Sequence, residues 1–498
     1  MELVKQSRAL AFGGLLAVAS LVGSAIPAQS APVTVAWPLD RINQRALPLD
    51  GNVSRGALTG LGVDIYLVDT GVRPTHEQLV GRVVAGIDIP TANGTAVVDP
   101  PSSDCDGHGT HVAGLAAGST TGVAPQARII SVRVLDCSGD GEVADVVKAL
   151  KWVRGDHQSG VPAVVNLSLG VDLGDDGRAI EEQVTELMNE GVVVTVASGN
   201  GDSAGKPFDA CKIAPGDVPR ALTVGAVSSA DIYAYYSNFG SCVDLFAPGG
   251  DRFRGIESSW NTSDTSYDFD VGTSMASPLV AGYAALLLQQ QPSLCVDAIA
   301  NAITSRATVG AITGLDALSP NKLLFIDTAT VPATTPGVAS NVITSTDAGS
   351  IVVTWDAPCD GGSPLTGTAV TLLYKGKAVK KSKVAPGVKG VRFTGLVNGR
   401  TYQVVVKASN ALGEGIATSR ISTVAVRTLR TGASIDRDVL ARIAGDLTLH
   451  WTVSSSSKKV CALRGETQRL VALRAGTCRV GLRTNLGGVP VLRSLRVS

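Results

Sequence analysis

The sequence predicts an α/β fold with a largely parallel sheet flanked by helices, followed by a β-sandwich and a small β domain. Two observations predict this division. From Gly62 to about Ala300, short apolar runs alternate with amphipathic segments, as in parallel strands joined by helices. After a Thr/Pro/Ala stretch at 329–336, apolar residues recur with a period of two, which is typical of strands. A chain of 498 residues has room for about three domains.

The elements follow in order along the chain. In the first part, we predict helices at 143–153 and 179–189, and buried strands at 63–68, 129–135, 163–167, 192–197 and 221–227. In the second part, alternating runs predict sandwich strands at 351–355, 370–374, 391–394, 402–408 and 421–426. We therefore divide the chain into an export signal (1–30), an α/β domain (31–328), a linker (329–336), a β-sandwich (337–428) and a small basic β domain (431–498).

The first 30 residues have the pattern of a secretory signal. Lys5 and Arg8 precede an apolar run at 9–26, and Ala28-Gln29-Ser30 has small residues spaced for cleavage. A retained membrane anchor is the alternative, but the run is near the short limit for a span. We therefore expect a secreted, extracellular protein with no transmembrane segment after signal cleavage. In an exported chain, the eight cysteines favour disulfides over metal sites.

Charge is divided unevenly along the chain. Residues 1–328 contain 20 basic and 35 acidic residues, whereas residues 329–498 contain 23 basic and 8 acidic residues. The acidic part argues against a nucleic-acid partner. The basic part predicts weak, salt-sensitive attachment to an anionic cell-wall or polymer surface, with a plain spacer as the alternative.

Four reactive residues lie in glycine-rich segments of the α/β part. Asp69 follows a predicted strand, where open parallel sheets place their sites, although an Asp before Gly is more often a turn former. His108 precedes a predicted helix and can act as a general base, and the nearby His111 alone makes a weak metal pattern. Ser274 lies at the start of an apolar helix, where it could be a nucleophile or an ordinary helix-capping residue. Asn200 lies in the loop that ends a predicted strand, where it could donate to an oxyanion or serve as a turn residue.

Together these motifs resemble the subtilisin-like serine protease family. The resemblance rests on Asp69-Thr70-Gly71, His108-Gly109-Thr110-His111 and Gly272-Thr273-Ser274-Met275-Ala276 and spans about residues 37–328. Within that family, Trp37-Pro38-Leu39-Asp40-Arg41-Ile42 and the cysteine positions look most like the proteinase K-type branch. Trp355, the 358–364 loop, Leu396, Tyr402 and the 410–413 turn resemble a fibronectin type III domain, with a generic immunoglobulin-like sandwich as the alternative.

The resemblance implies a role for each residue. Ser274 would attack the peptide carbonyl, His108 would transfer the proton, Asp69 would orient the imidazole, and Asn200 would stabilise the oxyanion. Substrate main chain would pair with Ser168, Leu169 and Gly170, beside Ala197, Ser198 and Gly199. We therefore expect a monomeric serine endopeptidase that hydrolyses proteins or peptides with broad specificity. The alternative is a catalytically silent surface or matrix-binding protein on a protease scaffold.

The resemblance also implies disulfides and structural calcium. It pairs Cys105 with Cys137 and Cys211 with Cys242, whereas the pairing of Cys461 with Cys478 comes from their neighbouring predicted strands. Cys295 and Cys359 could bridge two domains or remain free. Calcium ligands are expected at two places, where a solvated acidic loop is the alternative: Asp40, Asn43, Gln44, Asp50 and Asn52 at the first, and Pro219, Ala221 and Asp244 at the second.

Two features depart from the family pattern. Leu279 stands where relatives have a His after Ser-x-Pro, which predicts altered packing without loss of mechanism. About six residues separate the predicted signal cleavage from Trp37, so we expect no room for the long propeptide that assists folding in relatives. A lipase-type mechanism is disfavoured because no Gly-x-Ser-x-Gly motif occurs, and a cysteine protease because the cysteines count as disulfide partners.

Overall fold

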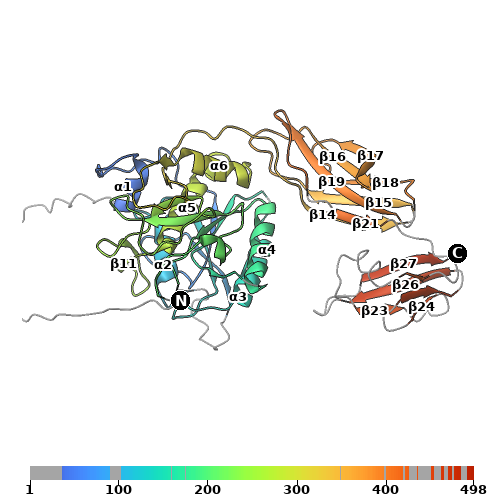
Figure 1. Cartoon of the computed structure of the whole chain (residues 1–498), viewed down its shortest axis with the longest axis horizontal. Helices are drawn as coiled ribbons and strands as arrows, with labels where there is room; N and C mark the ends of the chain where they lie inside the picture. The colour runs from blue at the N-terminus through green and yellow to red at the C-terminus, as the bar shows by residue number, and fades with distance from the viewer. Residues whose placement is uncertain are drawn as a thin grey trace, which may run out of the picture. The chain divides into compact units, whose positions relative to one another are not determined.

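The computed structural model describes the α/β part and the β-sandwich almost completely, and the last β segment in part (Figure 1). The described residues are 36–89, 103–158, 160–173, 175–202, 204–347, 349–397, 400–418, 421–424, 434–435, 450–453, 461–464, 469–473, 476–483 and 491–497. The predicted export signal lies outside them. The chain divides into two compact units, Met1–Pro332 and Ala333–Ser498.

The first unit is built on a nine-stranded sheet. Its strand order is β12 (Thr308–Val309), β13 (Lys322–Leu323), β9 (Leu245–Pro248), β8 (Leu222–Val227), β6 (Val193–Ala197), β4 (Ala163–Leu167), β1 (Asp64–Asp69), β3 (Arg128–Arg133) and β2 (Val83–Asp88). All neighbouring pairs are parallel except β12 with β13. Every residue of β1, β4, β6 and β8 is buried, which explains why these strands are continuous apolar runs in the sequence.

Helices cover the sheet in two groups (Figure 1). α3 (Val143–Asp156) packs on α4 (Asp175–Asn189), and α2 (His108–Ala117) packs on α5 (Thr273–Gln290). α5 also contacts β4, β6, β8 and β9. It is buried from Met275 to Leu288, as expected for a helix that is apolar on all sides. Leu279, which stands where relatives have a His, is fully buried in this helix and packs as an apolar side chain.

Smaller elements complete this unit. They are α1 (Trp37–Asn43), α6 (Val296–Arg306), a hairpin of β10 (Ile256–Ser259) and β11 (Tyr267–Asp270), and the pair β5 (Val171–Asp172) and β7 (Ile213–Ala214). A short 3-10 turn covers Ala210–Lys212. Among the described residues, no helix is long and apolar enough to cross a membrane.

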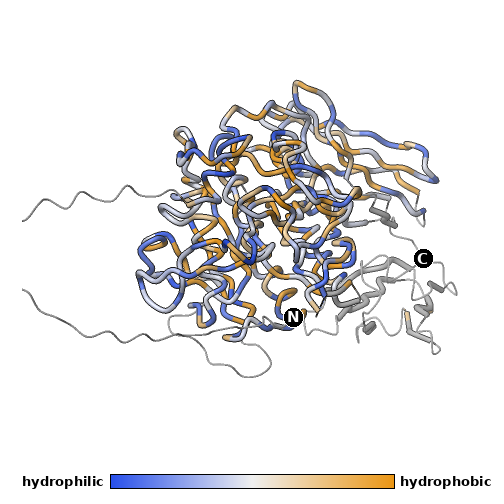
Figure 2. Tube along the Cα trace, turned by 60° about the vertical axis from the view of Figure 1, so that its left-hand side comes forward, coloured by the Kyte–Doolittle hydropathy of each residue, from blue (hydrophilic) through white to orange (hydrophobic). Residues whose placement is uncertain are grey.

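The second unit begins with a two-sheet sandwich. One sheet has β14 (Ser340–Asp347), β15 (Ser350–Asp356) and β18 (Gly390–Phe393). The other has β17 (Lys377–Val384), β16 (Gly367–Tyr374), β19 (Thr401–Asn410) and β20 (Gly413–Glu414), with β21 (Ile421–Val424) paired to β19. Their inner faces bury a core that includes Trp355, Val370, Leu372, Val404 and Val406. In Figure 2, orange trace lies mainly inside the described parts and blue trace at their edges.

The last segment contributes six described strands. β22 (Ser434–Ile435), β25 (Arg469–Ala472) and β24 (Cys461–Arg464) form one antiparallel sheet, and β23 (His450–Val453), β26 (Gly476–Arg483) and β27 (Val491–Val497) form another. The predicted alternation is therefore present as strands in this segment.

Candidate active site

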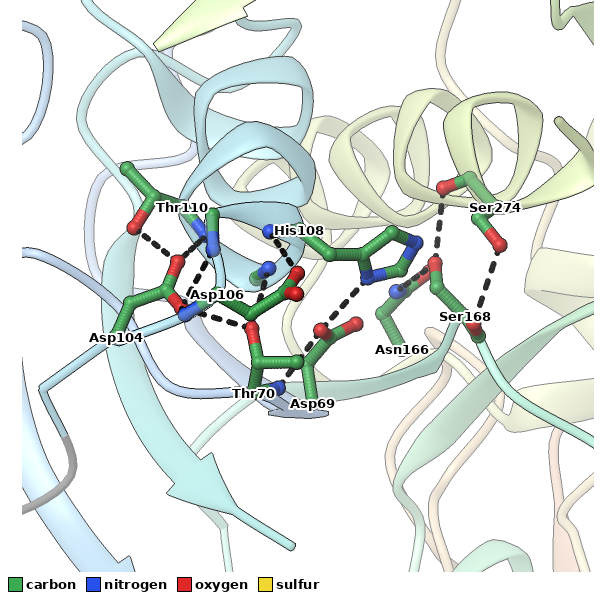
Figure 3. A network of polar contacts seen from close by, with 11 residues as sticks. Asp69, Thr70, Asp104, Asp106, His108, Thr110, Asn166, Ser168 and Ser274 are labelled. Carbon is green, nitrogen blue, oxygen red and sulfur yellow. Dashed lines mark hydrogen bonds and ion pairs between the residues drawn. The ribbon is translucent and has the colours of Figure 1, made fainter. Parts of the chain in front are cut away.

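The parallel sheet brings the reactive segments to one edge. β4, β1 and β6 are neighbours in the order β6-β4-β1, so the segments that follow them, beginning at Ser168, Thr70 and Ser198, leave the same edge. α2 begins at His108, and α5 begins one residue before Ser274. Figure 3 shows the His108 ring between Asp69 and Ser274.

Asp69 holds the His108 ring. Asp69 Oδ1 lies 2.7 Å from His108 Nδ1 and accepts a second hydrogen bond from the backbone N–H of Thr70 at 2.8 Å. A carboxylate oxygen can only accept, so Nδ1 carries a proton and its N–H donates the hydrogen bond to Asp69. Position 109 requires glycine, because a Cβ there would lie 2.1 Å from the carbonyl oxygen of Gly71 and 3.2 Å from Asp69 Oδ1.

The environment of His108 sets its protonation. Burial lowers the pKa of the imidazole, but the charge and hydrogen bond of Asp69, with the charges of Asp270 and Asp106, raise it to about 9. Asp69 itself is 1% exposed, so its charge is poorly screened by water. The site therefore favours the imidazolium that forms when His108 accepts a proton.

Ser274 is fixed by reciprocal contacts with Ser168 (Figure 3). Its Oγ donates to the Ser168 carbonyl at 3.2 Å, and Ser168 Oγ donates to the Ser274 carbonyl at 2.9 Å. Pro278 lacks the N–H that would otherwise bond the Ser274 carbonyl within the helix, so the Ser168 hydroxyl replaces it. Among the described residues, no hydrogen bond joins His108 Nε2 to Ser274 Oγ.

The amide of Asn200 is oriented by Thr273. Its Oδ1 accepts hydrogen bonds from the Thr273 backbone N–H at 2.9 Å and from the Thr273 hydroxyl at 2.8 Å. These two bonds turn Nδ2 away from Thr273 and toward Gly272, where a Cβ would lie 3.2 Å from Nδ2. The Asn200 donor and the backbone donors at the start of α5 therefore lie at one place.

Sequence reasoning missed Asp104, which organises the loop before His108 (Figure 3). Asp104 Oδ1 accepts from Thr70 Oγ1 at 2.9 Å and from the backbone N–H groups of Asp106 and Gly107 at 3.0 and 2.9 Å. Asp104 Oδ2 accepts from Thr110 N and Oγ1 at 2.9 and 2.6 Å. Asp104-x-x-x-His108 is a sequence signal that could have found it, since an Asx turn precedes the helix.

The predicted substrate-binding residues lie beside this site. Ser168 is buried, Leu169 is half-buried and Gly170 is exposed. Gly199 has a φ of 95° and a Cβ there would lie 2.5 Å from Asn238 Nδ2, so this turn beside Ala197 and Ser198 requires glycine. The Gly199 N–H donates to Thr273 Oγ1 at 3.1 Å, which ties this turn to the start of α5.

The first predicted calcium loop is largely satisfied by its own hydrogen bonds. The side-chain oxygens of Asn43, Gln44 and Asp50 accept from the backbone N–H groups of Ser54, Asp50 and Asn52 respectively. Asp40 Oδ2 accepts from Gly51 N, while Asp40 Oδ1 is buried with no partner among the described residues. Asp40 Oδ1 is thus the buried oxygen of the set that could bind a cation without losing a hydrogen bond.

The second predicted calcium site is a cavity of about 310 Å³ lined in part by Pro219, Ala221 and Asp244. Burial raises the pKa of Asp244 to about 6, although Asp244 Oδ2 accepts a hydrogen bond from Thr223 N at 2.8 Å. A buried carboxylate beside backbone carbonyls is an oxygen set that suits Ca²⁺. The described residues contain no cluster of three or more His, Cys, Asp or Glu side chains placed to bind a metal.

Disulfides link Cys105 to Cys137 and Cys211 to Cys242. Cys295, Cys359 and Cys461 are also disulfide-bonded, so the alternative of free thiols at 295 and 359 is wrong. The side chain of Cys478 lies outside the described residues, and its pairing with Cys461 stays a prediction. Cys105 lies between Asp104 and Asp106, so the first disulfide fixes the loop before His108.

Sequence comparison gives two matching families. The profile of the subtilase family matches residues 60–337, and the profile of the fibronectin type III domain matches residues 337–425. These matches cover the α/β part and most of the sandwich.

Known proteins are similar over the first unit. The chain is 44% identical over 289 residues to an extracellular serine proteinase of Thermus sp. (strain Rt41A), covering 58% of this chain and 65% of that protein. It is 43% identical over 289 residues to alkaline serine exoprotease A of Vibrio alginolyticus, covering 58% and 50%. The chain therefore spans between half and two thirds of the length of these relatives.

A solved structure is similar as well. The crystal structure of a cold adapted subtilisin-like serine proteinase has a TM-score of 0.53 and 41% identity, covering 59% of this chain and 99% of that one.

Proposed function

The chain belongs to the subtilase family, and from this premise we propose that it is a secreted serine endopeptidase that hydrolyses peptide bonds in proteins with broad specificity. The observation that carries the proposal is the 2.7 Å contact of Asp69 with His108 Nδ1, with the His108 ring facing Ser274. This contact leaves Nε2 as the proton acceptor on the side of the nucleophile.

In the proposed mechanism, Ser274 first leaves the Ser168 carbonyl. A substrate strand paired along Ser168–Gly170 would present a backbone N–H to that carbonyl and compete with the Ser274 hydroxyl for it. The hydroxyl then turns to His108 Nε2, gives up its proton and attacks the scissile carbonyl. Asp69 stabilises the imidazolium, which returns the proton to the leaving amine as the C–N bond breaks. A water molecule, activated by His108, would then hydrolyse the acyl ester on Ser274 and restore the hydroxyl.

The oxyanion would be held by two donors, Asn200 Nδ2 and the backbone N–H of Ser274. Thr273 supports this role because it occupies the amide oxygen of Asn200 and leaves the amide nitrogen to donate. A fixed donor needs no reorientation as charge develops.

We also propose structural calcium at Asp244 with the carbonyls of Pro219 and Ala221, where a cavity adjoins a buried carboxylate. At the Asp40 loop, the side-chain oxygens of Asn43, Gln44 and Asp50 would have to exchange their present hydrogen bonds for the ion, with Asn52 as a further ligand, so we propose weaker binding there. Calcium would supply stability and take no part in peptide hydrolysis. Calcium is expected to raise the Tm of the protein relative to EDTA, and less so in Asp244→Asn; equal Tm values in calcium and EDTA would remove the proposal.

For the rest of the chain, we propose that residues 1–30 are removed on export and that 31–328 form a monomeric protease domain. Residues 337–428 and 431–498 would form accessory β domains that attach the enzyme to an anionic cell-wall or polymer surface. The excess of basic residues after residue 328 supports this attachment.

The test of the activity is hydrolysis of casein or a peptide by the exported protein, with and without a serine-directed inhibitor. Ser274→Ala should abolish activity, while Ser263→Ala, which changes an exposed serine in a loop, should keep it. An inactive wild type that is folded by circular dichroism would replace the proposal with a silent surface-binding protein. An inactive and unfolded wild type would point to a missing folding aid.

A further inference from the structure

One segment of the sandwich is uniformly basic. The 53 residues from Gly361 to Gly413 contain nine basic residues and no Asp or Glu. The nine are Lys375, Lys377, Lys380, Lys381, Lys383, Lys389, Arg392, Arg400 and Lys407. This segment forms β16, β17, β18 and β19, so its charges gather on one domain.

β17 concentrates these charges at the edge of a sheet. It is the outermost strand in the order β17-β16-β19-β20, and four of its eight residues are lysines. Lys381 pairs with Thr371 and Lys383 with Ala369, whose neighbours Val370 and Leu372 face the core. Lys381 and Lys383 therefore lie on the outer face, about 7 Å apart along the strand.

These lysines have no acidic partners. Among the described residues of the second unit, the one ion pair joins Lys407 to Glu414 at 3.2 Å. Lys377, Lys380, Lys381 and Lys383 are all exposed. Lysine on an edge strand protects it from pairing, but like charges also destabilise the domain by repulsion, and basic residues extend beyond this strand to β18 and β19. Edge protection alone thus leaves most of this charge unexplained.

We propose that the lysine strand, defined as Lys375 and the four lysines of β17, binds a linear anionic polymer through its repeating charges. This proposal deepens the attachment proposed above and is independent of the proteolytic activity. Exposed point charges that recur along an edge strand, with Lys381 and Lys383 on its outer face, fit carboxylate or phosphate groups that repeat along a chain.

Nucleic-acid bases are a poorer match to this surface than a charged backbone. Base binding uses exposed aromatic faces. In the described part of the sandwich, Trp355, Phe393 and Tyr402 are buried, and Arg400 lies 4.7 Å from the centre of the Tyr374 ring. Recognition here would depend on charge rather than on stacking.

The test uses the full chain and three probes, polygalacturonate, polyphosphate and mixed-sequence single-stranded DNA, at salt concentrations from low to high. The variant is Lys377→Gln/Lys381→Gln/Lys383→Gln. The matched control, Lys148→Gln/Lys151→Gln/Lys206→Gln, removes the same charge from exposed lysines of the first unit. Hydrolysis of a small peptide is measured for all three proteins and should be unchanged.

We expect wild type to bind polygalacturonate and polyphosphate and to lose binding as salt rises. The β17 variant should bind about tenfold more weakly or worse, and the control should change less than about twofold. Three results would overturn the proposal: no binding of wild type at low salt, equal loss in the two variants, or preference for DNA over polyphosphate. Loss of peptide hydrolysis with polymer binding intact would count against the proposed activity alone.

Discussion

Replacing Asp104 with Asn tests whether the loop before His108 is held by this one carboxylate. Asp104 is 9% exposed and its side chain accepts five hydrogen bonds, three at Oδ1 and two at Oδ2. An Asn has one acceptor oxygen. If its NH₂ takes the place of Oδ2, it faces the N–H of Thr110; if it takes the place of Oδ1, it faces the N–H groups of Asp106 and Gly107.

The first arrangement costs less and sets the magnitude. One buried N–H loses its acceptor, and the remaining bonds lose their assistance from charge, so we expect the variant to be about 3 kcal/mol less stable. A small displacement of His108 relative to Asp69 and Ser274 should lower kcat by about 10- to 100-fold. KM should change little, because Asp104 lies away from Ser168–Gly170, where substrate is proposed to bind.

The assay measures kcat, KM and urea unfolding, with the pH dependence of kcat/KM as the readout of positioning. Weaker coupling between Asp69 and His108 should move the apparent pKa of the rate downward. Asp316→Asn is the matched control, since Asp316 also accepts two backbone N–H groups and a hydroxyl, in a loop of the same unit. The reasoning fails if folded Asp104→Asn keeps the wild-type kcat and pH profile, or if Asp316→Asn reproduces its kinetic changes.

Three further predictions concern the same site. His108 accepts a proton only when neutral, and its pKa is raised to about 9, so kcat/KM should rise with pH around a midpoint near 9. Asp106→Asn should lower that midpoint, because it removes one of the charges that raise the pKa. A wild-type midpoint below 7 would contradict the raised pKa of His108. Asn200→Ala should lower kcat by about 100-fold with KM nearly unchanged, since one oxyanion donor is worth about 3 kcal/mol; a loss confined to KM would exclude the role. Replacing Cys105 and Cys137 with Ser should lower the free energy of unfolding, measured in urea, by about 3 kcal/mol. It should also lower kcat, because this disulfide fixes the loop before His108. Replacing Cys211 and Cys242 with Ser is the comparison and should lower the free energy of unfolding without changing kcat.

The sequence located the reactive residues that directly follow a buried strand or lie at the start of a helix. Asp69 directly ends β1, Asn200 follows β6 by three residues, and His108 and Ser274 lie in the first turns of α2 and α5. A parallel sheet brings such positions to one edge, so a strand pattern with polar endings is enough to gather them. The same reasoning located β1, β3, β4, β6 and β8 as apolar runs, but it missed the short buried strand β9.

Hydrogen bonds between distant segments could not be predicted from the pattern, even where a local motif, as at Asp104, marks one of the partners. Asp104 bonds Thr70, 34 positions away, and Ser168 bonds Ser274, 106 positions away. Strands with exposed residues were missed for a related reason: β2 lies at the edge of its sheet, and β17 is lysine-rich, so neither is a buried apolar run. The spacing of apolar residues indicates which residues are buried, and a strand at the edge of a sheet has few buried residues to indicate. The chemistry of this chain could therefore be located from its sequence, whereas the contacts that position His108, and the strand that carries the lysines, required the fold.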